Sequence, residues 1–134
     1  MSQANVESVR EGIEGWNRGD FDAFLHNPHP DIEFVSDVLT RIEGTETVWR
    51  GPAGLRKFWD EWHALWNLTI EPSEIRDLGE TVLALGRMRT LGHASGVALE
   101  SPVAYVFEFE EGMLRKVRAY LETSDALRAV GLSR

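Results

Sequence analysis

Two runs of alternating side chains, joined by an acidic residue and a glycine, make up the sequence Glu100-Ser-Pro-Val-Ala-Tyr-Val-Phe-Glu-Phe-Glu-Glu-Gly-Met-Leu-Arg-Lys-Val-Arg-Ala-Tyr-Leu-Glu122. In the first run the aromatic residues Tyr105, Phe107 and Phe109 occupy every second position, which is the period of a β-strand. Glu111-Gly112 is an acidic-glycine pair of the kind that turns a hairpin. The sequence therefore predicts two paired strands joined by a tight turn.

The returning run alternates an apolar set of side chains with a set that contains a cation, a phenol and a carboxylate. The apolar set is Val117, Ala119 and Leu121, and the polar set is Arg118, Tyr120 and Glu122. We expect the polar set to face a pocket. The apolar set would then face a second copy of the chain, because a strand with both faces buried needs a cover for its outer face. The sequence thus predicts a homodimer formed through the outer face of the sheet.

The composition is that of a globular protein without disulfides. The chain has 134 residues, of which 43% are hydrophobic and 27% charged, so we expect one domain spanning residues 1–134. It contains no cysteine, which excludes disulfides, thiolate metal ligands and a cysteine nucleophile. A formal net charge of −8 argues against a nucleic-acid partner, because binding a phosphate backbone requires clustered Lys and Arg.

Two further features bear on where the protein resides. The N-terminal residues Met1-Ser-Gln-Ala-Asn5 lack the basic and apolar regions of a signal peptide. No apolar run approaches the roughly 20 residues that a membrane-spanning helix needs. We therefore expect a cytoplasmic protein that has no membrane partner.

Helical signals dominate the first half of the chain. A first amphipathic helix is expected over about residues 3–18, where apolar residues recur at helical spacing. Asp20 is suited to be the N-cap of a short second helix. Pro52 suits the first turn of a third helix. The apolar stripe of that third helix is Leu55, Phe58, Trp59, Trp62, Leu65 and Trp66.

Strand signals dominate the second half. Residues 32–36 are expected to form an early strand, and residues 37–49 an irregular or hairpin segment with a turn near Gly44. Two strands, over 68–77 and 81–91, precede the hairpin, and a short helix over 125–130 follows it. Helices gathered early and strands gathered late indicate an α+β domain, with helices packed on one face of an antiparallel sheet.

Six pieces of sequence occur in a characteristic order along nearly the full length. They are Trp16-Asn-Arg-Gly-Asp-Phe-Asp-Ala-Phe24, Pro30-Asp-Ile-Glu-Phe34, Trp49-Arg-Gly-Pro-Ala-Gly-Leu-Arg-Lys-Phe-Trp59, Ser95-Gly96, Glu111-Gly-Met-Leu-Arg-Lys-Val-Arg-Ala-Tyr120 and Asp125-Ala-Leu-Arg-Ala-Val-Gly-Leu132. In this order they resemble the SnoaL-like (polyketide cyclase-like) branch of the nuclear-transport-factor-2-like (NTF2-like) superfamily. The resemblance implies a cone, in which a curved antiparallel sheet wraps around three N-terminal helices and a short C-terminal helix follows. It also implies a homodimer.

In this branch the last strand commonly carries a tyrosine, an apolar residue and an aspartate that faces the pocket, which correspond here to Tyr120, Leu121 and Glu122. A carboxyl group inside an apolar cone is poorly solvated, which suits Glu122 to general acid-base catalysis. Tyr120 would donate to a carbonyl or enolate oxygen, and Arg118 would anchor an anionic group. The alternative is a salt-bridged strand face that contains a core tyrosine.

Other charged residues are weaker candidates for the pocket. Arg87 and Arg89 share a strand face among leucines, so one of them is a candidate to point into the cone; the alternative places both at the open end or at a dimer rim. By analogy with ketosteroid isomerases of this fold, Glu33 or Asp37 is a candidate general base.

Large aromatic residues are more numerous than a small core usually needs. They explain stability first, because burying one such side chain contributes roughly 1.5–3 kcal/mol. A subset is also expected to form the walls of an apolar pocket suited to a flat ligand. The subset is Trp16, Phe24, Trp49, Phe58 and Trp62.

The histidines give no metal signature. His26 and His29 flank prolines in a loop that is a candidate for the mouth of the pocket, whereas His63 is expected to be exposed to solvent. None of these three histidines, and not His93 either, has a partner at a metal-ligand spacing such as His-x-x-x-His. We therefore expect neither a metal nor a cofactor.

Two functions remain open. The first is a cofactor-free acid-base enzyme of the isomerase, cyclase or dehydratase type, acting on an apolar molecule that carries a carbonyl group. The second is a non-catalytic module that binds a small apolar ligand or a partner subunit. The fold does not choose between them, because it hosts enzymes and binders alike.

Overall fold

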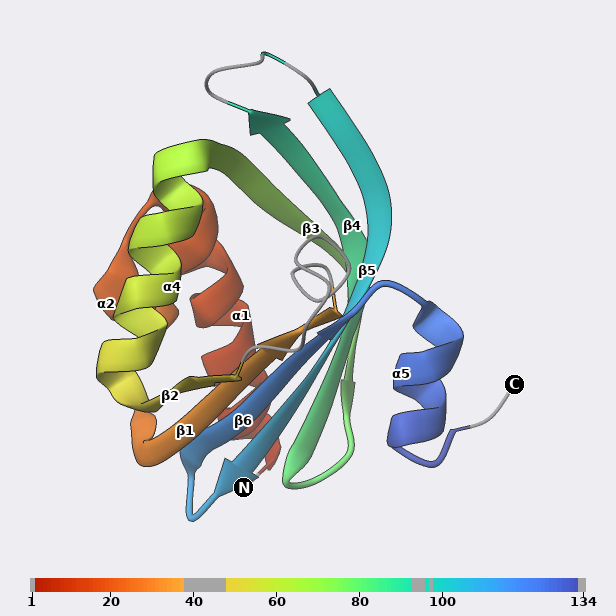
Figure 1. The fold of residues 1–134 in the computed structure, drawn as a ribbon. Coiled ribbons are helices and arrows are strands. Elements are labelled where there is room, and N and C mark those ends of the chain that lie inside the picture. The colour runs from red at the N-terminus through yellow and green to blue at the C-terminus, as the bar shows by residue number, and fades with distance from the viewer. Residues whose placement is uncertain (1, 38–47, 93–95, 97, 133–134) are drawn as a thin grey trace.

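The computed structural model describes residues 2–37, 48–92, 96 and 98–132, and the order of the elements follows the predicted pattern (Figure 1). The elements are α1 (Ser2–Arg18), α2 (Phe21–Phe24), β1 (Pro28–Ser36), β2 (Val48–Arg50), α4 (Gly51–Leu65), β3 (Trp66–Asp77), β4 (Thr81–Gly92), β5 (Ala98–Glu110), β6 (Met113–Tyr120) and α5 (Thr123–Ala129). The α+β prediction is confirmed.

The strands form one curved sheet in the order β2-β1-β6-β5-β4-β3. All neighbouring pairs are antiparallel except β1 and β6, which are parallel. The expected antiparallel sheet is therefore a mixed one. A parallel pair needs a long crossover, and here α4 together with β3, β4 and β5 supplies it between β1 and β6. Helices α1, α2 and α4 cover one face of the sheet, which we call the inner face, and α5 lies on the opposite, outer face (Figure 1).

The predicted hairpin is formed by β5 and β6. Glu111 and Gly112 both have positive φ, at 52° and 80°, as a two-residue turn with right-handed strand twist requires. Phe107 pairs with Val117 and Tyr105 with Ala119, so these four side chains point to the same face.

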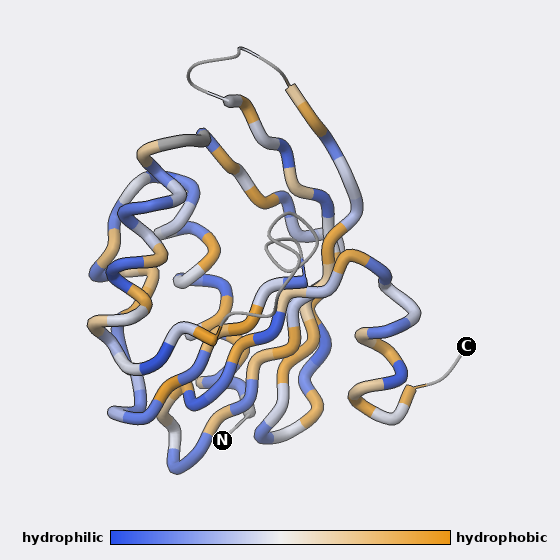
Figure 2. The backbone as a smooth tube through the Cα atoms, viewed as in Figure 1, coloured by the Kyte–Doolittle hydropathy of each residue, from blue (hydrophilic) through white to orange (hydrophobic). Residues whose placement is uncertain are grey.

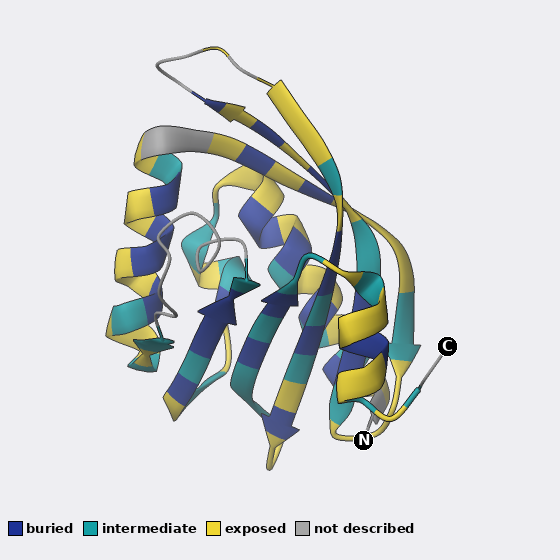
Figure 3. Cartoon of the chain, turned by 45° about the vertical axis from the view of Figure 1, so that its right-hand side comes forward, coloured by how far each residue is buried: buried dark blue, intermediate teal, exposed yellow. Residues whose placement is uncertain are grey.

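Two hydrophobic cores lie on either side of the sheet. The larger one fills the space beneath α1 and α4, where Ile32 and Leu55 are almost fully buried. The smaller one lies beneath α5 and includes Leu83, Ala104 and Leu127. Figure 2 shows hydrophobic residues interleaved with hydrophilic ones along the helices, and Figure 3 shows buried residues alternating with exposed ones along α4. Each helix thus buries one face, as its residue spacing predicts.

Some ends of the helices and strands agree with the prediction and others differ. Asp20 caps α2 as predicted, accepting a hydrogen bond from the Ala23 backbone nitrogen at 3.2 Å. Helix α4 ends at Leu65 and Trp66 begins β3, so the helix is one residue shorter than the predicted apolar stripe. Strand β1 begins at Pro28, four residues before the predicted start at residue 32. The predicted turn near Gly44 lies outside the described residues. No helix in the described part of the chain is long and apolar enough to cross a membrane.

Helix α1 is fastened to β3, an edge strand of the sheet, by two consecutive side chains. Trp16 Nε1 donates to the Leu68 carbonyl oxygen at 2.7 Å. The Asn17 amide donates to the Ile70 carbonyl oxygen at 2.7 Å and accepts from the Ile70 backbone nitrogen at 2.8 Å. These contacts satisfy backbone groups that an edge strand otherwise leaves unpaired.

Helix α2 packs so closely on α1 that one position of α1 has no room for a side chain. A Cβ placed on Gly15 would lie 2.5 Å from the Phe24 nitrogen, whereas one on Gly12 would lie 3.3 Å from the Phe24 oxygen. We expect Gly15→Ala to lower the free energy of unfolding by about 1–3 kcal/mol because of overpacking. Both substitutions gain about 1 kcal/mol of helix propensity, but Gly12→Ala does so without that overlap. Urea denaturation of both variants measures the difference, and equal stabilities would contradict the close approach.

Candidate functional site

A cavity lies between the helices and the inner face of the sheet. The cavity and its opening together have a volume of about 980 Å³. We call it the inner cavity, and its wall is mainly apolar. The apolar side chains that line it are Val9, Ile13, Trp16, Phe24, Leu25, Phe34, Leu55, Phe58, Trp62, Leu68, Ile70, Met88, Phe107, Phe109, Leu114, Val117 and Ala119.

Few polar side chains reach the inner cavity. Ser8, His26 and Asn27 lie at its rim, where His26 and Asn27 are exposed, and Ser36 and Tyr105 lie further inside. Among the described residues that line it, none is Asp, Glu, Lys or Arg. The cavity can therefore hold an uncharged ligand without leaving a buried charge unpaired.

The predicted orientation of β6 is wrong. Val117 and Ala119 are buried and line the inner cavity, and Leu121 packs against the larger core. These three side chains therefore face inward and do not form an outer dimer surface. The register explains the error, because Val117 and Ala119 stand opposite Phe107 and Tyr105 on the face that the helices cover. The inverse arrangement would bury the charge of Arg118 in an apolar space.

The polar set of β6 lies on the outer face and beyond the strand end. Arg118 forms an ion pair with Asp37 at 2.9 Å and lies 5.3 Å from the centre of the Tyr120 ring. Tyr120 packs against the smaller core beneath α5. Glu122 stands at the N-cap position of α5 without a side-chain cap bond, and it is exposed. The prediction that its carboxylate faces the cavity is therefore wrong, because the chain has left the sheet at Tyr120.

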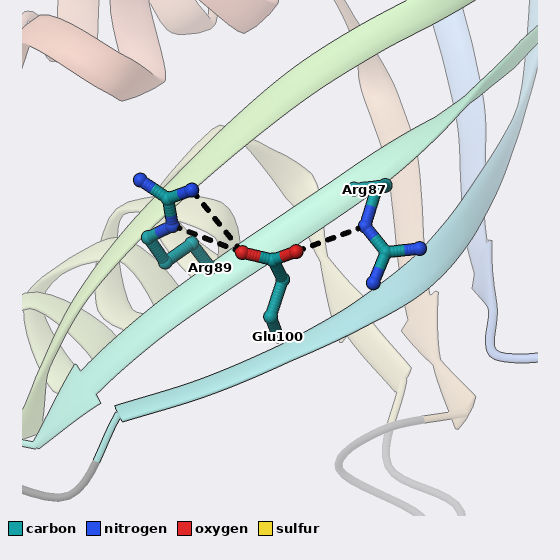
Figure 4. Close-up of polar contacts among 3 residues, drawn as sticks. All are labelled: Arg87, Arg89 and Glu100. Atoms are coloured by element: carbon teal, nitrogen blue, oxygen red, sulfur yellow. Dashed lines mark hydrogen bonds and ion pairs between the residues drawn. The ribbon is translucent and has the colours of Figure 1, made fainter.

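The two arginines of β4 also point to the outer face. Arg87 and Arg89 both hydrogen-bond to the Glu100 carboxylate on β5, at 3.2 Å and 3.1–3.2 Å (Figure 4). Hydrogen bonds from Arg89 and Arg87 hold the pKa of Glu100 below its ordinary value. All three residues are exposed. The sequence left open whether one of these arginines points into the cone or both lie outside it. The structure agrees with the second alternative.

The acids of the early strand are likewise engaged outside the cavity. Glu33 pairs in register with Arg50 of β2, and their side chains form an ion pair at 2.5 Å. Asp37 is the partner of Arg118. Neither acid lines the inner cavity, so the structure does not bring a carboxylate base into it from β1.

The predicted aromatic wall is placed largely as expected. Trp16, Phe24, Phe58 and Trp62 line the inner cavity. Trp49 does not line it, but the centre of its ring lies 5.8 Å from that of Phe58, so it packs against a residue of the cavity wall. The four wall aromatics come from α1, α2 and α4, so the helices provide flat apolar surfaces opposite the sheet.

Tyr105 lines the cavity, although the sequence predicted no role for it beyond strand alternation. Its neighbours on the inner face, Ala84 and Ala119, are small, which leaves space around the ring. No hydrogen bond joins its hydroxyl to another described residue. Burial raises the pKa of Tyr105 well above the ordinary value of a phenol. The hydroxyl is therefore protonated at neutral pH and can donate a hydrogen bond to a ligand. Its period-2 alternation with Phe107 and Phe109 was the signal that it shares their face.

His26 hydrogen-bonds to two groups at the rim. Its Nδ1 lies 3.2 Å from the Ala23 carbonyl oxygen, and its Nε2 lies 3.1 Å from Ser8 Oγ. The predicted place of this histidine at the pocket mouth agrees with the structure. His29 instead bonds to Glu110 at 3.1 Å and does not line the cavity.

His63 is not the solvent-exposed residue that its place off the apolar stripe predicted. It is half-buried, and its ring stacks on Trp59 with 4.0 Å between the ring centres. Across the described residues there is no group of three or more His, Asp or Glu side chains placed to hold a metal ion.

Comparison with known proteins identifies the family to which the chain is similar. A model of the SnoaL-like domain matches residues 9–117. No curated protein matches the sequence significantly. An NTF2-like protein of unknown function from Burkholderia pseudomallei is 21% identical, with a TM-score of 0.79 and coverage of 96% of this chain and 98% of that one.

Two other crystal structures are comparably similar. TerC, co-crystallised with polyporic acid, is 18% identical with a TM-score of 0.78, covering 95% of this chain and 98% of that one. An NTF2-like protein from Burkholderia xenovorans is 21% identical with a TM-score of 0.74, covering 98% of each chain. At these identities the likeness shows the fold alone, and the predicted NTF2-like fold is confirmed.

The two tyrosines of the chain provide a test of the burial at Tyr105. Burial raises the pKa of Tyr120 as well, although the nearby Arg118 opposes the shift. In Tyr120→Phe only Tyr105 remains, and we expect its phenolate absorbance to appear at higher pH in the folded than in the urea-unfolded protein. Since the folded state then holds the proton more tightly, its stability falls as pH rises above about 10. Coincident titrations in the two states would contradict the burial.

Proposed function

The chain belongs to the SnoaL-like domain family, and on that premise we propose that it binds a small, largely apolar molecule in the inner cavity. The observation that carries the proposal is the lining of the cavity. Its wall is apolar, it bears no charged side chain among the described residues, and a few polar groups face it. This combination is typical of small-molecule sites, in which apolar surface supplies affinity and a few polar groups set orientation.

The wall favours a flat, ring-bearing ligand. Trp16 and Phe58 lie 5.8 Å apart between ring centres and tilt by 33°, and Trp62 continues the surface along α4. Aromatic faces of this kind pack well against planar rings. The structural relative TerC was co-crystallised with polyporic acid, which supports a small-molecule ligand for this chain as well.

Tyr105 sets the second requirement on the ligand. Its protonated hydroxyl has no hydrogen-bond partner among the described residues, so it is available to donate to a ligand. A ligand that carries a carbonyl or another uncharged acceptor would satisfy it. We therefore propose a planar, apolar ligand with an acceptor oxygen at one end.

The acceptor requirement is tested with two probes of similar shape, acetylnaphthalene and ethylnaphthalene. We expect Tyr105→Phe to weaken binding of the ketone by about 3–10-fold, the equivalent of one lost hydrogen bond. Binding of the hydrocarbon should change little. Quenching of the tryptophan fluorescence measures both affinities, because Trp16 and Trp62 line the cavity. An equal change for the two probes would rule out Tyr105 as the donor.

The location of the site is tested by filling the cavity. Ala119 lines it beside Tyr105, and Ala129 is exposed on α5 at the other side of the sheet. We expect Ala119→Phe to weaken ethylnaphthalene binding by at least about tenfold, because the added ring occupies the space of the ligand. The matched control, Ala129→Phe, should bind as the unmodified protein does. Cooperative thermal unfolding of both variants shows that the fold is kept, and unchanged binding in Ala119→Phe would overturn the proposed site.

A further inference from the structure

We propose that His26, beside Ser8 at the rim of the inner cavity, is the general base of a proton-transfer site. This inference rests on the proposed function, because the reacting molecule is held by the apolar cavity. It replaces the carboxylate that the sequence predicted with an imidazole that the structure places at the cavity.

The hydrogen bonds of His26 determine which nitrogen is the base. The Ala23 carbonyl oxygen can only accept, so Nδ1 of His26, at 3.2 Å, carries a proton. In the neutral ring Nε2 is then the unprotonated nitrogen, and the Ser8 hydroxyl, at 3.1 Å, donates to it. Holding one nitrogen by a backbone carbonyl orients the other toward its task, as in sites where histidine exchanges protons.

The rim is held in place by the hairpin. The Asn27 amide donates to the Gly112 carbonyl oxygen at 2.9 Å, and the Leu114 nitrogen donates to the Asn27 carbonyl oxygen at 3.0 Å. His26, the preceding residue, therefore lies at the turn end of β5. Tyr105 lies four residues before Phe109 on the same strand, which is about 13 Å at the rise of a β-strand. The base and the phenol therefore lie at different positions along β5, with the base nearer the turn.

A purely structural role accounts poorly for the Ser8–His26 pair. Helix α2 is already joined to α1 by the Asp20 nitrogen, which donates to the Gly15 carbonyl oxygen at 2.8 Å, and by the contact of the Trp16 and Phe24 rings at 5.3 Å. An exposed hydrogen bond adds little to such a contact. Both side chains of the pair also line the cavity instead of pointing away from it.

The reaction class that fits is removal of an acidic proton from a planar, apolar substrate. The Ser8 hydroxyl first turns away from Nε2, and the freed lone pair of His26 Nε2 takes a proton from carbon. The electron pair of the broken C–H bond forms a new multiple bond, and a group on the neighbouring atom leaves with its electrons. The proton then passes from Nε2 to solvent at the exposed rim. No oxidant, reductant or co-reactant is required.

A nitrobenzisoxazole tests this step because it is small, flat and apolar, and reacts by base-promoted ring opening. The base removes the ring C–H proton, the nitrile bond forms and the N–O bond breaks to give a coloured cyanonitrophenolate. We expect saturable turnover by the unmodified protein. His26→Gln, which keeps the size and a hydrogen-bonding group but lacks the basic nitrogen, should lower kcat by at least about tenfold with little change in KM. His29→Gln, at a histidine outside the cavity, is the matched control and should leave kcat unchanged.

Ser8→Ala separates a histidine base from a serine that itself reacts or relays the proton. With His26 as the direct base, kcat should stay within about threefold of the unmodified value. A loss as large as that of His26→Gln would overturn this assignment, as would full turnover in His26→Gln or no turnover by the unmodified protein.

Ethylnaphthalene binding, measured on the same samples, keeps this test apart from that of the proposed function. If the unmodified protein does not bind this probe, the proposed function fails. If it binds and His26→Gln turns over normally, only the proton-transfer site fails. Retained probe binding by His26→Gln also shows that the variant is folded.

Discussion

The attachment of α1 to the edge of the sheet is the constraint on which the cavity depends. Trp16 and Asn17 make three hydrogen bonds to the backbone of β3 at Leu68 and Ile70. These bonds fix the position of α1 relative to the inner face of the sheet. The curved sheet and the helices then enclose a space that their own side chains line without filling. Because the same bonds satisfy the edge strand, α1 also protects β3 from pairing with another chain.

The Trp16 ring extends this attachment to the other helices. It contacts Phe24 of α2 at 5.3 Å and Trp59 of α4 at 5.1 Å between ring centres. Aromatic contacts therefore join the three helices to one another. The sheet lines the cavity with aromatic side chains, such as Phe107 and Phe109, and with short ones, such as Ala119 and Val117. The short side chains leave room for a flat ligand beside the aromatic rings.

The sequence predicted the elements of this fold well because their signals are local. Helical spacing, the Asp20 cap and the Glu111-Gly112 turn each depend on a few adjacent residues. The faces of β6 were harder, because alternation separates Val117 from Arg118 without saying which of them points inward. That choice is made by pairing with Phe107 and by the position of the helices. The pairing of β1 with β6 is equally non-local, which is why the parallel strand pair was missed. Ser8 and His26, 18 residues apart, gave no joint signal.

The placement of charge follows from the same division of the sheet into two faces. On the outer face, carboxylates and guanidinium groups pair where water still solvates them, as in the cluster of Arg87, Arg89 and Glu100. Exposed pairs of this kind contribute little to stability, so their position reflects where charge is tolerated more than what holds the fold. A carboxylate moved to the inner face would need a partner there, and the apolar wall offers none. The proposed chemistry of this cavity therefore relies on no carboxylate, but on a phenol within and an imidazole where the cavity meets water.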